Sequence, residues 1–140
     1  MSNFYESMLN SGMGRKVLGT VGLPTPIEFN RYSAGQATFL EGNVLVGTAK
    51  NGELISDIVR NLGESDAKIF FPSAALTASE IVKAGADNDV KVTQVECVKG
   101  MKEKFNVVIF DASGIEDGDG LSQLYTFFHP IMRSLASNAR

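Results

Sequence analysis

The most distinctive pattern in the chain is an unbroken apolar run over residues 107–110, followed by a polar turn and a long amphipathic segment. Successive β-branched and aromatic residues are typical of a parallel strand that is covered on both faces. The pattern therefore predicts a buried strand ending at Asp111, then a loop, then a helix with Asp119 as its N-cap. Pro130 should kink this helix, because proline lacks a backbone donor. Its predicted apolar face comprises Leu121, Leu124, Tyr125, Phe128, Met132 and Leu135.

Three other segments rich in apolar residues, at 44–46, 67–71 and 90–98, predict three further strands. The second run ends at Pro72, which can neither donate to a ladder nor continue it. The third run alternates imperfectly between apolar and polar residues.

Helical spacing of apolar residues predicts a helix over 52–62, with Gly63 in the left-handed conformation that ends many helices. A second, short helix should begin with a capping box of Thr77 and Glu80 and close at Gly85. Alternation of strands and helices favours a parallel sheet with right-handed crossovers. The predicted fold class is α/β: a Rossmann-like (flavodoxin-like) parallel sheet of about four strands with flanking helices.

The chain has 140 residues, of which 44% are hydrophobic, and this is enough for one domain with its own core. Residues 1–42 show no periodic core of their own, so we expect an irregular N-terminal arm that packs on the domain. Residues 43–140 form the predicted domain, which we expect to be truncated before its next strand.

The net charge of −3 and the scattered basic residues give no reason to expect nucleic acid or anionic lipid as a partner. The single cysteine and single histidine cannot form an ordinary zinc site, so no metal is expected. No secretory signal or bilayer-spanning segment is evident, so we expect a soluble, cytoplasmic protein.

The turn after the first strand, GTAKNGELI, is where a dinucleotide-binding fold places its glycines. A short-chain dehydrogenase would have glycine at Gly47, Asn51 and Glu53, and only the first is present. Glu53 would also place a negative charge where the pyrophosphate should bind. We therefore predict a degenerate turn that binds no cofactor.

Asp111 is the remaining candidate for a ligand contact, because ligands in open α/β sheets bind beyond the carboxyl ends of the strands. A carboxylate satisfied by neighbouring backbone donors is the preferred interpretation. His129 is interpreted as structural because no catalytic partner is evident, and Cys97 as a small core residue. No catalytic residue is predicted.

A more specific likeness is carried by three segments: NSGMGRKVLGTVGLPTPIEFNRYSAGQ, GNVLVGTA and KFNVVIFDASGIEDGDGLSQLYTFFHPIMRSL. The chain resembles the N-terminal domain of the high-molecular-weight 3-oxoacyl-[acyl-carrier-protein] reductases, which belong to the short-chain dehydrogenase/reductase family. That resemblance implies a degenerate first domain, followed in the same polypeptide by a reductase domain that uses NADH or NADPH to reduce 3-oxoacyl thioesters in fatty-acid biosynthesis. None of Tyr5, Tyr32 and Tyr125 has a lysine four positions later, so the catalytic Tyr-x-x-x-Lys pair is absent here.

We therefore expect a noncatalytic N-terminal domain that acts in oligomerisation or in shaping the substrate entrance. Its expected partners are the downstream reductase domain, further copies of itself, and acyl carrier protein or acyl-CoA. A nucleotide- or acyl-carrier-binding module is the alternative, and an independent small enzyme is the least favoured. The 107–110 strand should also have an unpaired edge, covered by the N-terminal arm or, preferably, by association of two chains.

Overall fold

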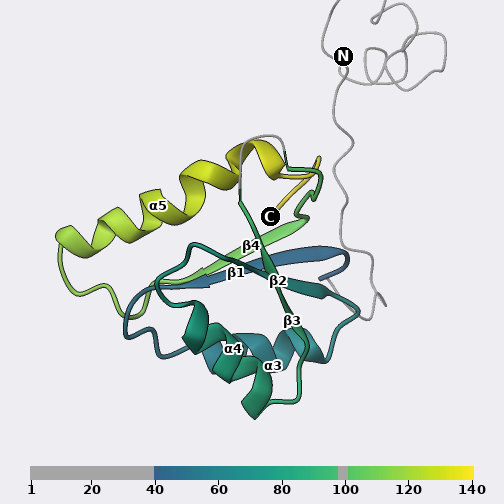
Figure 1. The fold of residues 1–140 in the computed structure, drawn as a ribbon, viewed down its shortest axis with the longest axis horizontal. Helices are drawn as coiled ribbons and strands as arrows, with labels where there is room; N and C mark the ends of the chain where they lie inside the picture. The colour runs from purple at the N-terminus through teal and green to yellow at the C-terminus, as the bar shows by residue number, and fades with distance from the viewer. Residues whose placement is uncertain (1–39, 98–100) are drawn as a thin grey trace, which may run out of the picture. The chain divides into compact units, whose positions relative to one another are not determined.

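The structure is a computed structural model that describes residues 40–97 and 101–140. These residues form a four-stranded parallel sheet in the order β3-β2-β1-β4, with helices on both faces (Figure 1). The predicted α/β, Rossmann-like arrangement is therefore confirmed. The predicted N-terminal arm lies outside the described residues as far as position 39.

All four predicted strands are present. They are β1 (Asn43–Thr48), β2 (Lys68–Pro72), β3 (Val92–Val95) and β4 (Val107–Asp111), so β3 is shorter than predicted. The helices are α3 (Ile55–Gly63), α4 (Ala78–Asp87) and α5 (Ser122–Ile131), and short 3-10 helices at Asp119–Leu121 and Met132–Ser134 flank α5.

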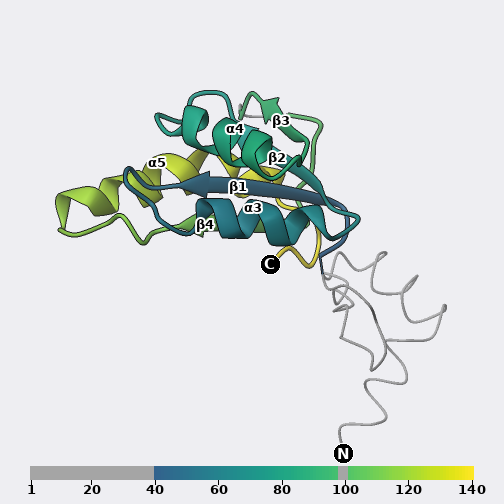
Figure 2. The same ribbon diagram turned by 90° about the horizontal axis from the view of Figure 1, so that it is seen from below.

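Helices α3 and α4 cover one face of the sheet and α5 lies on the other, as Figures 1 and 2 show from two directions. Because successive side chains of a strand point to opposite faces, β1 contributes to two cores. Val44 and Val46 pack with the residues of α3 and α4, whereas Leu45 packs with Phe127 and Ile131 of α5. This alternation explains why β1 is apolar at successive positions.

Two predictions about glycine at helix ends are wrong. Gly63 is the last residue of α3, and Gly42 is the only described glycine with a positive φ. Gly85 lies buried inside α4, which continues to Asp87. A Cβ atom at Gly63 would overlap the Val90 side chain, and one at Gly85 would lie 2.9 Å from the Val90 carbonyl oxygen. Both glycines therefore make room for the segment that enters β3.

The predicted side-chain caps are also absent. Thr77 precedes α4, but its hydroxyl donates to the Thr48 carbonyl at 2.8 Å rather than capping the helix. Asp119 begins the 3-10 turn before α5, and no side chain caps either of these helices. Thr77 therefore ties the start of α4 to the end of β1.

The predicted apolar face of α5 is only partly correct, because the sheet selects a different face. Phe127 and Ile131 are the buried residues of this helix, and the Phe127 ring packs 4.8 Å from that of Phe110. The helix ends one residue after Pro130 and continues as a 3-10 turn. Three residues of the predicted face are instead exposed: Leu121 (55%), Tyr125 (67%) and Met132 (58%).

The edge of β4 is paired in part by the end of the chain itself, so the expectation that no segment of this chain pairs beside it is wrong. Ala136 donates to the carbonyl of Phe105 at 2.8 Å. The Arg140 N–H donates to Asn106 at 3.0 Å, and Val108 donates to the Arg140 carbonyl at 2.8 Å. This pair of bonds is the pattern of a parallel ladder. Residues 135–140 thus pair with Phe105 and Asn106 before β4 and with Val108 at its start.

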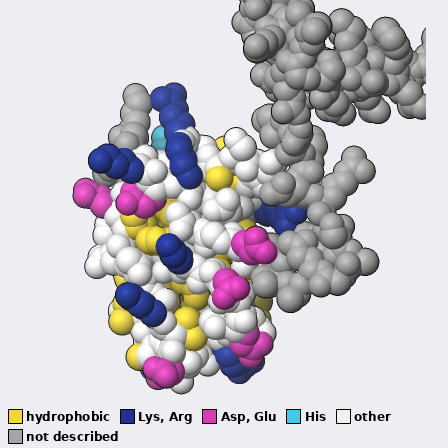
Figure 3. All heavy atoms as spheres, turned by 90° about the vertical axis from the view of Figure 1, so that its right-hand side faces the viewer, with side chains coloured by type: hydrophobic (Ala, Val, Ile, Leu, Met, Phe, Trp, Pro, Cys, Tyr) yellow, Lys and Arg dark blue, Asp and Glu magenta, His cyan; other side chains and the backbone are white. Residues whose placement is uncertain are grey.

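Acidic and basic side chains are interspersed on the face shown in Figure 3. That face therefore has no basic patch. Within residues 40–97 and 101–140, no helix is long and apolar enough to cross a membrane.

Candidate functional site

The candidate site is the crevice at the carboxyl ends of β1 and β4. These two strands are neighbours in the sheet, yet the helices that follow them, α3 and α5, lie on opposite faces (Figure 2). This reversal is the topological switch point at which open α/β sheets bind their ligands. The sequence placed Asp111 at this position, and the structure confirms its location.

The carboxylate of Asp111 is fully engaged by groups of the same chain. Its side chain is 3% exposed and accepts four hydrogen bonds. Oδ1 accepts the Ser113 hydroxyl at 2.6 Å and the Ser113 N–H at 3.0 Å. Oδ2 accepts the Leu54 N–H at 2.9 Å and the Thr48 hydroxyl at 3.4 Å. Asp111 thus joins the two loops that form the crevice.

Burial and hydrogen bonding act in opposite directions on Asp111. Desolvation raises the pKa of its carboxyl group, because burial disfavours the charged form. The bonds from Ser113, Leu54 and Thr48 favour the charged form and outweigh that effect, so the pKa lies below its ordinary value. Asp111 is therefore an ionised structural group at neutral pH.

The N–H groups just before α3 donate hydrogen bonds to the side chains of Asp111 and Ser113. The first N–H groups of a helix have no partner within it and commonly bind phosphate. Here the Leu54 N–H binds Asp111, and the Glu53 N–H donates to the Ser113 hydroxyl at 2.8 Å. A side-chain anion of the protein occupies the place that a pyrophosphate takes in a dinucleotide-binding fold.

Two glycines allow the loops of the crevice to touch. A Cβ atom at Gly114 would overlap the Lys50 carbonyl oxygen and lie 2.6 Å from the carbonyl carbon of Asn51. A Cβ atom at Gly52 would overlap the Thr48 hydroxyl. The backbone after β4 therefore rests directly on the backbone after β1, and no space separates them there.

The three positions of the degenerate turn have separate structural roles. Gly47 lies within β1 beneath the Phe127 ring, which fills the space that a side chain would need. Asn51 adopts a left-handed backbone with φ of 63°. Glu53 is exposed and precedes α3, which begins two residues later than Glu53. The helix thus begins three residues later than the predicted start at residue 52, and the Glu53 N–H group donates to the Ser113 hydroxyl.

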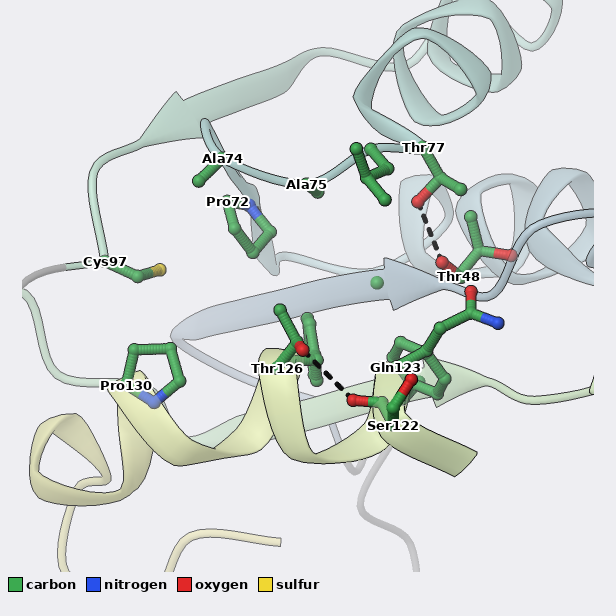
Figure 4. A pocket seen from close by; sticks show the side chains of 14 residues that line it. Thr48, Pro72, Ala74, Ala75, Thr77, Cys97, Ser122, Gln123, Thr126 and Pro130 are labelled. Carbon is green, nitrogen blue, oxygen red and sulfur yellow. Dashed lines mark hydrogen bonds between the residues drawn. The ribbon is translucent and has the colours of Figure 1, made fainter. Parts of the chain in front are cut away.

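A separate pocket lies on the α5 side of the sheet, with a volume of about 220 Å³ (Figure 4). The loop between β2 and α4 forms one wall and α5 forms the other, while the end of β1 lies between them. Its lining residues are Gly47, Thr48, Pro72, Ala74, Ala75, Leu76, Thr77, Cys97, Phe110, Ser122, Gln123, Thr126, Phe127 and Pro130.

Neither Cys97 nor His129 belongs to a reactive cluster. Cys97 is a partly buried free cysteine at the pocket wall, and its burial raises the thiol pKa. His129 is exposed and stacks on Tyr125, with ring centroids 4.8 Å apart. In the described part of the chain, no three His, Cys, Asp or Glu residues are grouped so that they could hold a metal ion.

Sequence reasoning placed Ser113 and Gly114 beside Asp111 at the end of the strand, but it did not identify their contacts with the loop after β1. The short Asp-x-Ser spacing is a usable signal, because an aspartate often binds the backbone two residues ahead of it. The pocket had no such signal, since it depends on which face of α5 is turned toward the sheet.

A scan against protein-family models gave no match, and no curated protein matched the chain significantly.

Proposed function

We propose that this chain is a noncatalytic, Rossmann-like domain that accompanies an NAD(P)H-dependent 3-oxoacyl-acyl carrier protein reductase domain in the same polypeptide. It acts in oligomerisation or in shaping the substrate entrance of the active domain, whose substrates are carried by acyl carrier protein or coenzyme A. The observation that carries the noncatalytic part is the position of Asp111. The link to this reductase comes from the sequence resemblance described above.

The geometry around Asp111 argues against cofactor binding in the crevice. A pyrophosphate would need the Glu53 and Leu54 N–H groups, and both are already bound. It would also meet the ionised carboxylate of Asp111, and two like charges close together in a buried site repel strongly. The contact between Gly114 and the Lys50–Asn51 backbone leaves no path for the phosphates.

The Tyr-x-x-x-Lys pair that would supply the proton during hydride transfer is also absent from this sequence. Reduction of a ketone requires a group that protonates the developing alkoxide. Tyr125 is the only tyrosine within residues 40–97 and 101–140, and it is exposed on α5 and followed four residues later by His129 rather than by lysine.

The outer face of α5 supports the oligomerisation role. Leu121, Tyr125 and Met132 are each more than half exposed on or beside this helix. Clustered exposed apolar residues are typical of interaction surfaces.

Titration of the full chain with NADH, followed by amide NMR, tests the noncatalytic part. We expect no saturable change at Glu53 or Leu54, and no NADH oxidation when a 3-oxoacyl thioester is added. Micromolar binding that moves these two amide signals would contradict the proposal.

Sequencing the gene beyond the codon for Arg140 tests the reductase part. We expect a second glycine-rich turn followed by a Tyr-x-x-x-Lys pair in the same reading frame. A stop codon directly after Arg140 would refute the link to a reductase but not the noncatalytic assignment.

A further inference from the structure

The pocket beside α5 originates in the way the chain crosses the sheet. The order β3-β2-β1-β4 places β3 and β4 at opposite edges, so the segment that joins them must cross the sheet. The described residues of this connection, 96–97 and 101–106, contain no helix. On this face α5 is therefore the only described helix, and a hollow remains between it and the loop that follows β2 (Figure 4).

The pocket carries no charge. None of its lining residues is acidic or basic, and most of its walls are formed by proline, alanine, leucine and phenylalanine side chains. Figure 4 shows Pro72 and Ala74 on one wall, Pro130 and Thr126 on the other, and Cys97 at one end. Burial raises the pKa of the Cys97 thiol, which keeps this end neutral as well.

The hydroxyl groups in the lining donate hydrogen bonds within the protein. The Thr77 hydroxyl donates to the Thr48 carbonyl at 2.8 Å, and the Thr126 hydroxyl donates to the carbonyl of Ser122 at 3.0 Å. The Gln123 amide oxygen accepts the N–H of Lys50 at 2.9 Å. A charged ligand would therefore lose its hydration without gaining a partner of opposite charge.

We propose that this pocket is a binding site for an uncharged aliphatic group, such as the end of a linear alkyl chain. A dry apolar cavity of about 150 Å³ is large enough for benzene. The volume of about 220 Å³ found here accommodates a somewhat larger hydrocarbon group. A buried water needs two to four polar partners, so water competes poorly for this space. The site goes beyond the proposed accessory role and does not depend on it.

Linear alcohols are suitable probes, with amide NMR of the full chain as the readout. Each buried methylene should tighten binding roughly fourfold, so hexan-1-ol should bind about fifteenfold more tightly than butan-1-ol. The affected amides should be those of Ala74, Ala75, Gln123 and Thr126. Hexane-1,6-diol is the matched polar control, and we expect it to bind about tenfold more weakly, because its second hydroxyl gives up hydration on entering a mainly apolar pocket.

A variant that fills the pocket completes the test. Thr126→Phe places a ring in the hollow, and the hydroxyl that it removes bonds only within its own helix. We expect it to abolish hexan-1-ol binding, whereas Ser79→Phe adds the same ring at an exposed position of α4 outside the pocket and should leave binding unchanged. If Thr126→Phe does not fold, Ala74→Phe closes the mouth from the opposite loop.

Any of three results would refute the proposed binding site. These are amide shifts scattered over the whole surface, equal affinity for hexan-1-ol and hexane-1,6-diol, or undiminished hexan-1-ol binding by a folded Thr126→Phe or Ala74→Phe variant.

Discussion

Replacing Asp111 by asparagine should weaken the domain substantially, although the two side chains have nearly the same shape. Asparagine presents one oxygen and one NH₂ group to four donors that now face a carboxylate. The retained oxygen keeps its partners but loses the charge, which costs about 1 kcal/mol of stability. The NH₂ group would point at N–H and O–H donors, so neither it nor those donors would have a hydrogen-bond partner. This costs about 1–3 kcal/mol more of folding stability.

The expected decrease in the free energy of unfolding is therefore about 2–4 kcal/mol. For a domain of about one hundred residues, each kcal/mol shifts the melting temperature by about 4–8 °C. The chain has no tryptophan, so urea denaturation is best followed by far-UV circular dichroism. Asp66→Asn is the matched control, because Asp66 is exposed and the change should stay within about 0.5 kcal/mol.

The effect should depend on pH in a defined direction. The pKa of Asp111 is lowered in the folded state, so its carboxylate contributes stability above the unfolded pKa of about 3.9. This contribution is lost as the pH falls through the folded pKa, and the difference between the two proteins should therefore shrink below about pH 4. A variant as stable as the wild type at pH 7, or a difference that persists unchanged to pH 2.5, would refute this account of Asp111.

Three further changes test other contacts by the same urea assay or by light scattering. Gly114→Ala should destabilise the domain by about 1–3 kcal/mol because its Cβ overlaps the opposite loop, whereas Gly118→Ala meets no atom within 4 Å and should be close to neutral. Thr77→Val should lose about 1–2 kcal/mol with its buried hydrogen bond, while Glu80→Ala should have little effect because no capping box forms; equal losses of stability would contradict this account. Tyr125→Lys should abolish any self-association that light scattering detects at rising wild-type concentrations, since it places a charge on the exposed face of α5; unchanged association would exclude this face.

The parallel strands could be predicted because buried strands in such sheets are nearly continuous apolar runs. Val44–Val46 is fully buried, and the partly buried run before Asp111 packs against the cores on both faces of the sheet. The location of Asp111 also followed from the sequence, since it depends only on where β4 ends. Its bonds to Leu54 and Thr48 did not, because these residues lie 57 and 63 positions away in the chain.

The helix faces and glycine roles were harder to predict for a physical reason. Helix α5 carries apolar residues around most of its circumference, so periodicity alone could not identify the buried face. The packing of Phe127 over Gly47 determines that face, and it is a contact between distant parts of the chain. Gly63 and Gly85 likewise respond to Val90 rather than to their own helices. Such contacts leave no local periodic signal in the sequence.

The Asp111 network also bears on why a cofactor would bind poorly in this crevice, even if its other contacts were favourable. A nucleotide would first have to displace a carboxylate that is covalently part of the protein and already ordered. At about 1.4 kcal/mol per factor of ten, losing about 2–4 kcal/mol of internal bonding weakens binding about 30- to 700-fold. Asp111→Asn removes the charge but leaves Gly114 against the Lys50–Asn51 backbone. We therefore expect this variant to lose stability without gaining NADH affinity in calorimetry. If it instead binds NADH at micromolar concentrations, charge alone excludes the cofactor, and the contact between the two loops is no barrier.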